Sequence, residues 1–218
     1  MSETTSFTPA AGFHWLTPFY DLIVTMLTRE ERWRSALVSQ IRPSSDDRIA
    51  DLGCGTGSLL VRLARAAPNA HLVGIDPDPD ILERARAKLA RGDVSLLRGF
   101  ARDAAVLLRD QRVTKIVSSL VLHQVPMAEK TAALRAAYDA LPSGGELHIA
   151  DYALQRSTRM RMLFRLTVQS FDGVDNTEPQ ARGILPELIV AAGFADVAET
   201  YVFDTLTGSI SLFRAVRP

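Results

Sequence analysis

Short apolar runs alternate with amphipathic stretches through the middle of the chain. The apolar runs are rich in Val, Ile and Leu and are typical of buried strands. They predict strands at residues 48–53, 71–75, 94–98, 115–120 and 146–151. The stretches between them repeat apolar positions at helical spacing. They predict helices at residues 57–67, 79–91, 101–110 and 128–141. This alternation predicts an α/β fold, in which a doubly wound, mostly parallel sheet has helices on both faces.

The N-terminal part of the chain precedes this alternation. Residues 15–27 and 30–41 predict two helices, which are separated near Thr28 and end before Pro43. We interpret residues 1–45 as an N-terminal helical cap and residues 46–218 as the core domain.

The C-terminal third also departs from the alternation. Residues 156–170 predict a basic amphipathic helix and residues 171–176 a polar turn, so residues 156–176 are interpreted as an insertion into the core. The remaining predicted elements are a helix at 183–192 and strands at 197–205 and 209–216. The two strands lie close enough in sequence to form an antiparallel hairpin.

A glycine-rich turn follows the first predicted strand, with the sequence Asp51-Leu52-Gly53-Cys54-Gly55-Thr56-Gly57. Glycines at alternate positions have no Cβ, so the backbone can turn sharply and approach a ligand closely. Asp76 ends the second strand, at about the spacing that lets an acid accept from the ribose hydroxyls of an adenosine compound. The acid at Asp51 would repel a pyrophosphate and attract an ammonium group, which favours S-adenosylmethionine over a dinucleotide. A turn without a ligand is the alternative interpretation.

Several segments, including this turn, resemble those of a known family. The turn resembles the first motif of the class I S-adenosylmethionine-dependent methyltransferases. Residues 116–126 resemble the fourth-strand motif of that family, and residues 141–147 and 192–194 its turns before strands five and six. Residues 19–21 are similar to a segment of the ubiquinone and menaquinone C-methyltransferases and their small-molecule relatives. The resemblance spans roughly residues 13–217. It implies a Rossmann-like, seven-stranded sheet with an antiparallel C-terminal hairpin, and S-adenosyl-L-methionine as cofactor.

One segment differs from the family pattern. Gly99-Phe100-Ala101 stands where such proteins usually have Gly-Asp-Ala, whose acid accepts from the adenine amino group. Phe100 could stack on the adenine or meet its edge, Asp103 could supply the acceptor, and the N–H of Ala101 could donate to the ring. The residues predicted to bind the cofactor are Asp51, Gly53, Cys54, Gly55, Gly57, Asp76, Pro77, Phe100, Ala101, Ser119, Leu120 and Tyr20.

Three residues are candidates for catalysis. Methyl transfer from a sulfonium needs an aligned acceptor, and it needs a general base when the acceptor is a hydroxyl or an acidic C–H. His123 follows the fourth strand and is the candidate base, expected to titrate near neutrality; a histidine that caps a turn or lines the cofactor pocket is the alternative. Asp151 ends the fifth strand and could orient His123 or a substrate, or pair with a basic residue. Tyr20 could reach the methionine part of the cofactor or be an ordinary core residue.

Composition narrows the remaining possibilities. The 25 Lys and Arg residues balance the 25 Asp and Glu residues, which gives no indication of a nucleic-acid partner. Cys54 is the single cysteine, so an internal disulfide is excluded, and the chain lacks a compact ligand set for a metal. No apolar run reaches the length of about 18 residues typical of a membrane span, and the N-terminus lacks the pattern of a signal peptide. We therefore expect a cytoplasmic protein without an integral membrane segment, either a monomer or a homodimer.

The sequence leaves the acceptor molecule open. The segment 156–176 mixes Met160, Met162, Leu163, Phe164, Leu166 and Val168 with arginines. It favours a small apolar or amphiphilic acceptor. A non-catalytic S-adenosylmethionine-binding or partner-binding protein of the same fold is the main alternative, and a nucleotide-dependent oxidoreductase is a weaker one.

Overall fold

The computed structural model describes residues 28–89 and 94–218. At its centre is a seven-stranded sheet with the order β3-β2-β1-β4-β5-β7-β6. Its strands are β1 Arg48–Leu52, β2 His71–Asp76, β3 Val94–Arg98, β4 Lys115–Ser119, β5 Glu146–Tyr152, β6 Ala195–Thr205 and β7 Gly208–Val216. Strands β1 to β5 are parallel, and β7 runs antiparallel to both β5 and β6. The predicted fold class and terminal hairpin are confirmed.

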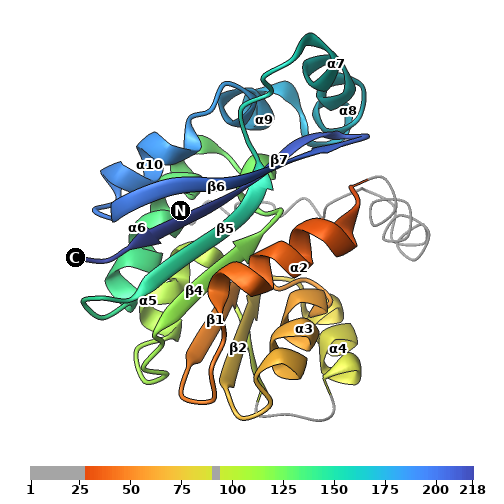
Figure 1. Ribbon diagram of the computed structural model, residues 1–218. Coiled ribbons are helices and arrows are strands. Elements are labelled where there is room, and N and C mark those ends of the chain that lie inside the picture. Colours follow the sequence, from red (N-terminus) through yellow and green to blue (C-terminus); the bar gives the residue numbers. More distant parts are fainter. Residues whose placement is uncertain (1–27, 90–93) are drawn as a thin grey trace, which may run out of the picture.

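Helices cover both faces of the sheet, so the molecule has three layers (Figure 1). One face is covered by α2 Glu30–Ile41, α3 Ser58–Ala66 and α4 Pro79–Lys88. The other face is covered by α5 Ala104–Leu107, α6 Met127–Ala140 and α10 Leu185–Ala191. The helix predicted at residues 101–110 is shorter than expected, because its first turn is the 3₁₀ helix η1 Ala101–Asp103.

The strand order places a topological switch point at β1. The chain passes from β1 to β2 and β3 on one side, and then returns to β4 on the other. In open α/β sheets, ligands bind beyond the carboxyl ends of the strands at this point. The glycine-rich turn follows β1 and the His123 segment follows β4, so both lie at this edge.

Helix α2 packs as part of the core layer. Its residues Trp33, Leu37 and Ile41 recur at four-residue spacing and are fully buried in the same cluster as Ile49. The two-domain division into residues 1–45 and 46–218 stays a prediction, and residues 1–27 lie outside the part that the structure describes.

The segment after β5 is more helical than predicted. It forms α7 Thr158–Leu166, α8 Val168–Asp172 and α9 Val174–Ala181, which lie beyond the carboxyl end of β5 (Figure 1). A single helix over 156–170 and a turn at 171–176 are therefore wrong. The backbone of Thr167, with φ −112° and ψ −85°, departs from the helix and makes the first break. The hydroxyl of Thr167 donates to the carbonyl of Thr207, which fastens this break to the β6–β7 turn. Gly173, with φ 81°, makes the second break.

The two ends of this helical segment meet beside β5. The N–H of Gln155 donates to the carbonyl of Ala181 at 3.1 Å. The side chain of Gln180 donates to the carbonyl of Tyr152 at 3.3 Å. The segment therefore leaves the sheet and returns to it at one place.

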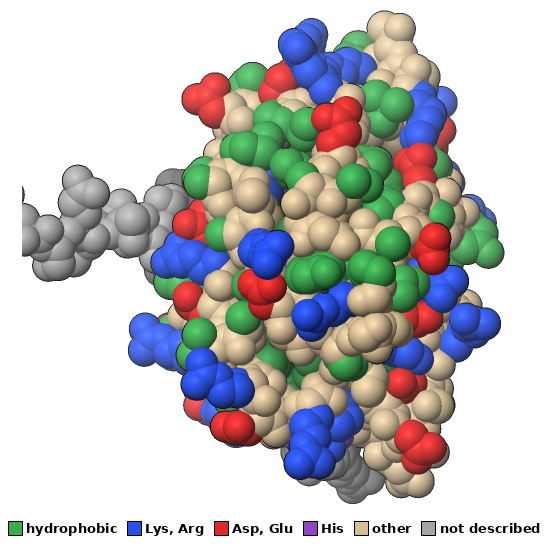
Figure 2. All heavy atoms as spheres, turned by 90° about the vertical axis from the view of Figure 1, so that its left-hand side faces the viewer, with side chains coloured by type: hydrophobic (Ala, Val, Ile, Leu, Met, Phe, Trp, Pro, Cys, Tyr) green, Lys and Arg blue, Asp and Glu red, His purple; other side chains and the backbone are tan. Residues whose placement is uncertain are grey.

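Charged side chains of both signs are interspersed on the face shown in Figure 2, and neither sign gathers into a patch there. Among the described residues, no helix has the length and apolar character required to cross a bilayer.

Candidate cofactor and acceptor site

The glycine-rich turn is held tightly against β2 and the end of β4. The N–H groups of Gly53 and Cys54 both donate to the carbonyl of Ile75, at 2.8 and 3.0 Å. A Cβ added at Gly53 would lie 2.3 Å from Val121, whereas one added at Gly55 would meet nothing within 4 Å. Both glycines have positive φ. The turn is therefore fixed against β2 and Val121 on one side and has free space beside Gly55, as a backbone that binds a ligand requires.

Asp51 supplies an unpaired buried charge under this turn. Its side chain is 1% exposed, and neither carboxylate oxygen has a hydrogen-bond partner among the described residues. Burial raises the pKa of Asp51 to about 7, while the nearby Arg34 opposes the shift and Asp76 adds to it. A buried polar group without a partner is costly. This arrangement fits a cationic ligand group such as the ammonium of S-adenosylmethionine.

Arg34 is a candidate site residue that the sequence patterns did not reveal. It lies on α2, forms an ion pair with Glu30 at 2.6 Å, and donates to the hydroxyl of Ser119 at 3.5 Å. Its guanidinium also stacks over Trp33, 4.6 Å from the ring centroid. Burial lowers the pKa of Arg34, and the charges of Glu30 and Asp51 counteract this. Arg34 therefore brings a positive charge to the edge where β1 and β4 end.

Asp76 lies at the end of β2, where it also supports the turn. Its carboxylate accepts from the N–H of Gly55 at 3.0 Å and from the N–H of Asp78 at 3.1 Å. Burial raises the pKa of Asp76, and these two N–H groups oppose the shift. Asp76 is 9% exposed, so its carboxylate can still meet a ligand. Its predicted contact with ribose, and that of Pro77 beside it, stay predictions.

The region predicted to receive the adenine contains Phe100 and its neighbours. The N–H of Phe100 donates to the carboxylate of Asp103 at 3.1 Å, and Arg102 lies 4.3 Å over the Phe100 ring. Arg102 is itself paired with Glu129 at 2.5 Å. One face of Phe100 is thus covered by a guanidinium, and one oxygen of Asp103 is occupied. The roles predicted for Phe100, Ala101 and Asp103 stay predictions.

His123 lies between two carboxylates at the end of β4, on the 3₁₀ turn η2 Leu122–Gln124. Its Nδ1 is 2.7 Å from the carboxylate of Asp151, and its Nε2 is 3.5 Å from that of Asp172 on α8. Burial alone would lower the pKa of His123, but Asp151 and Asp172 outweigh it and raise that pKa to about 9. The expectation that this imidazole titrates near neutrality is wrong, because both ring nitrogens face a carboxylate.

Asp151 orients His123 and the turn that holds it. Besides His123, it accepts from the N–H groups of Val121 and Leu122, at 3.2 and 2.7 Å. Asp151 is fully buried, and its carboxylate meets the His123 ring and backbone N–H groups. Of the three alternatives for Asp151, the structure supports orientation of His123.

The other predicted residues are placed as follows. Leu120 has φ 56° and donates its N–H to the carbonyl of Ala150, which turns the chain sharply after β4. Ser119 precedes it and accepts from Arg34. Cys54 is buried, and burial raises the pKa of its thiol above the usual range, which fits a packing side chain and not a nucleophile. Tyr20 lies outside the described residues.

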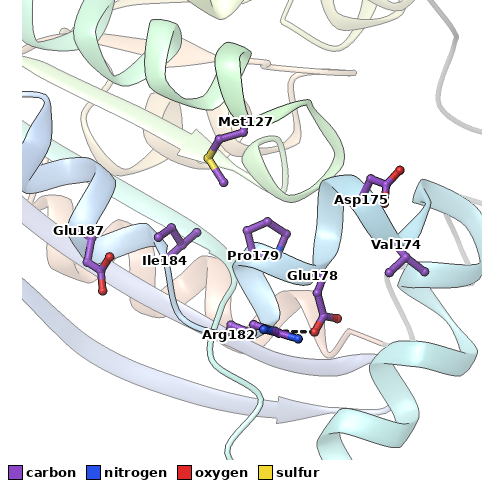
Figure 3. Close-up of a pocket in the computed structure, with 8 residues that line it drawn as sticks. All are labelled: Met127, Val174, Asp175, Glu178, Pro179, Arg182, Ile184 and Glu187. Carbon is purple, nitrogen blue, oxygen red and sulfur yellow. Dashed lines mark hydrogen bonds and ion pairs between the residues drawn. The ribbon is translucent and has the colours of Figure 1, made fainter.

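An open recess of about 540 Å³ adjoins the His123 turn between α6, α9 and α10 (Figure 3). Met127, Pro179 and Ile184 supply apolar walls, and Arg182 is paired with Glu178 at 2.8 Å. The side chain of Asn176 on α9 donates to the carbonyl of Gln124, which joins this wall to the turn. Neither His123 nor the glycine-rich turn is among the residues that line the recess.

Known proteins with similar sequences decide the family. The methyltransferase-domain family matches residues 49–145. Demethylmenaquinone methyltransferase of Thermus thermophilus is 30% identical over 161 residues, which cover 72% of this chain and 71% of that protein. The chain belongs to the class I S-adenosylmethionine-dependent methyltransferases. S-adenosylmethionine is the cofactor of this family, and the unpaired carboxylate of Asp51 fits it.

Two further comparisons agree with this family. The ubiquinone/menaquinone biosynthesis C-methyltransferase of Syntrophotalea carbinolica is 27% identical over 157 residues, which cover 70% of this chain and 65% of that protein. The chain thus spans slightly less than two thirds of that relative. A solved S-adenosylmethionine-dependent methyltransferase of Thermotoga maritima has the same fold, with a TM-score of 0.69 and 18% identity. The match covers 94% of this chain and 99% of that one.

Proposed function

We propose that this protein methylates a small apolar or amphiphilic molecule whose acceptor atom gives up a proton to His123. The observation that supports this proposal is the placement of His123, which Asp151 holds at the edge of the sheet beside the glycine-rich turn. The cofactor supplies a methyl group already activated by the sulfonium, so the protein has to bind, align and exclude water.

The residues around the turn divide the cofactor between them in this proposal. Asp51 accepts from the ammonium group, and Arg34 meets the carboxylate of the same methionine part. Asp76 accepts from the ribose hydroxyls while it holds Gly55. The backbone of the turn, with Cys54, Gly53 and Gly57, lies under the methionine part. Ser119, Leu120 and the Phe100–Ala101 segment border the remainder of the cofactor.

His123 receives the proton at Nε2, because Nδ1 is held by Asp151 at 2.7 Å. With a pKa of about 9, only about 1 in 100 of the His123 side chains is neutral at pH 7. An acceptor that displaces Asp172 from Nε2 removes one of the two charges that keep His123 protonated. Acceptor binding therefore favours the neutral imidazole that a base requires.

The apolar character of the acceptor is inferred from the side chains around Asp172. Phe171 and Val174 flank it and are 73% and 57% exposed. Met162 and Leu166 of α7 are exposed as well. Such exposed apolar side chains next to a buried polar pair are typical of a site for an apolar body with one polar group.

Two measurements test the proposal. Calorimetry should show binding of S-adenosylhomocysteine and none of NAD. Turnover with labelled S-adenosylmethionine on a library of phenols, acidic carbon compounds, amines and thiols should then fall about a hundredfold in His123→Gln. His71→Gln is the matched control, since His71 bonds Gln111 at the opposite edge of the sheet.

The outcomes distinguish the alternatives. Failure to bind S-adenosylhomocysteine would refute the proposal as a whole. Binding without turnover on any class would favour a non-catalytic cofactor-binding or partner-binding protein. Full turnover of His123→Gln on an amine or thiol would remove His123 as the base. A cytoplasmic location and a monomeric or homodimeric state stay predictions, as does the absence of a nucleic-acid partner.

A further inference from the structure

Lys130 is a fully buried basic residue that contacts the backbone of the His123 turn. It lies in the first turn of α6 and has no solvent-exposed surface. Its ammonium group donates to the carbonyl of Leu122 and to the carbonyl of His123, the latter at 3.2 Å. Both carbonyls belong to η2, so Lys130 holds the turn that presents the imidazole.

A lysine at this position is costly. Burial removes the hydration of the ammonium group, and the N-terminal end of a helix repels a positive charge. Burial lowers the pKa of Lys130 to about 8, and the charge of Asp151 opposes the shift. A methionine of similar length would fill the same space without these costs.

The choice of lysine over arginine is also informative. The chain has three lysines among its 25 basic residues. Lysine can lose its proton when buried, whereas arginine stays charged. Most basic residues of this chain are arginines, but the buried basic residue that contacts the His123 turn is a lysine.

The charges around His123 come from four elements. Asp151 of β5 and Asp172 of α8 are the carboxylates, and His123 of η2 and Lys130 of α6 are the basic groups. The nearby Tyr152 ring packs edge-on against His123 at 4.9 Å, and Asn176 of α9 meets the turn through an amide. Arg102 of η1 and Glu129 of α6 pair with each other.

These charges cancel when His123 is protonated, and one negative charge is left when it is neutral. Lys130, with a pKa of about 8, loses its own charge before His123 titrates, so its effect on His123 is exerted through the backbone of η2. The same ammonium group fixes the turn through two hydrogen bonds.

We infer that Lys130 is a positioning residue that fixes the His123 turn and so holds the imidazole between Asp151 and Asp172. This inference rests on the proposed role of His123 as the base. Its test needs one readout on the imidazole itself and one on the reaction.

The test compares two substitutions at this position. Lys130→Met removes the charge and both donors, and Lys130→Gln removes the charge but keeps an N–H donor. The titration of His123 is followed by NMR of the full chain, with His123→Gln assigning its signal among the four histidines. Lys115→Met is the matched control, because Lys115 pairs with Asp47 at 2.7 Å at the opposite edge of the sheet.

Lys130→Met should shift the titration of His123 downward, because a loosened turn weakens the contacts with Asp151 and Asp172 that raise the pKa of His123. Lys130→Gln keeps one donor to the turn and should shift the titration less. Lys130→Met should also broaden the His123 signal, because the turn is no longer fixed. Lys115→Met should leave the titration unchanged.

The outcomes separate this inference from the proposed function. An unchanged His123 titration in both folded variants would overturn the inference, and Lys130 would then be a packing residue. A shifted titration with no matching shift in the pH dependence of turnover would support Lys130 as a positioning residue and refute His123 as the base. If Lys130→Met does not fold, the titration of Lys130→Gln alone decides.

Discussion

Asp51 should make the cofactor-free protein less stable than it could be. The pKa of Asp51 is raised by burial to about 7 in the folded protein, against 3.8 for the unperturbed side chain. An acid whose pKa is raised on folding favours the folded state only while it is protonated. Below about pH 4 the side chain is protonated in both the folded and the unfolded state, so it does not lower the stability of the fold. As the pH rises from about 4 to about 7, Asp51 ionises in the unfolded chain before it does in the folded protein, and the free energy of unfolding falls. Above that range the ionised carboxylate destabilises the fold by about 4 kcal/mol, since each pKa unit is worth about 1.4 kcal/mol.

The substitution Asp51→Asn removes this charge with little change in shape. We expect the variant to be more stable than the wild type by about 2 kcal/mol at pH 5 and by about 4 kcal/mol at pH 8. Urea denaturation at the two pH values measures the difference. The same variant should lose most of its affinity for S-adenosylhomocysteine in calorimetry, because the carboxylate for the ammonium group is gone.

A matched substitution at the opposite end of β1 should behave in the reverse sense. Burial tends to raise the pKa of Asp47, but its bonds to Lys115 and Ser44 outweigh this and hold it below the usual value. Asp47→Asn should therefore destabilise the protein at neutral pH and lose its effect in acid. If the stability curves of Asp51→Asn and the wild type ran parallel from pH 5 to pH 8, Asp51 would not be an unpaired buried charge and the reasoning would fail.

Three further substitutions test the site. In the wild type, kcat/KM should rise with pH up to about 9, the pKa of His123. His123→Gln should abolish this rise in the pH profile. A rise that persists in the variant would belong to another group. Arg34→Met should weaken S-adenosylhomocysteine binding about ten- to a hundredfold, which is the effect of losing a charge-assisted bond. The control Arg62→Met removes an exposed ion pair with Glu31 and should leave this binding unchanged. Asp76→Ala should weaken binding by a similar factor and also speed hydrogen exchange at Gly55, whose N–H it holds; unchanged affinity would remove Asp76 from the site.

The sheet and the glycine-rich turn could be predicted because their signals are local. Buried parallel strands read as apolar runs, and the turn after β1 has its glycines and acids within a few residues. The positions of Asp51, Asp76 and His123 at one edge follow from strand order alone. The hydrogen bonds of these residues do not follow from strand order. The pKa of His123 could not be predicted from the sequence, because Asp172 contacts the imidazole from α8.

Other features depend on contacts between distant parts of the chain. Arg34 meets Ser119 across 85 positions, and its helix has several charged residues of equal prominence in the sequence. The break at Thr167 is fastened to the carbonyl of Thr207, 40 positions away. The burial of Lys130 depends on how α6 lies against η2. Spacing and composition do not determine such contacts.

The bonds that close the base of the α7–α9 segment have an evolutionary consequence. Gln155 meets Ala181 and Gln180 meets Tyr152, so the segment begins and ends at neighbouring points on the edge of the sheet. A segment of another length or sequence could start and finish at the same two points of the sheet, although it would have to replace the bonds that the present segment makes to Thr207, Gln124 and His123. On the proposed function, in which this segment borders the acceptor, acceptor choice can diverge through this segment while the strands and the glycine-rich turn keep their places. A chimera that joins a foreign segment between residues 155 and 181 is the natural design for altering which molecule is methylated.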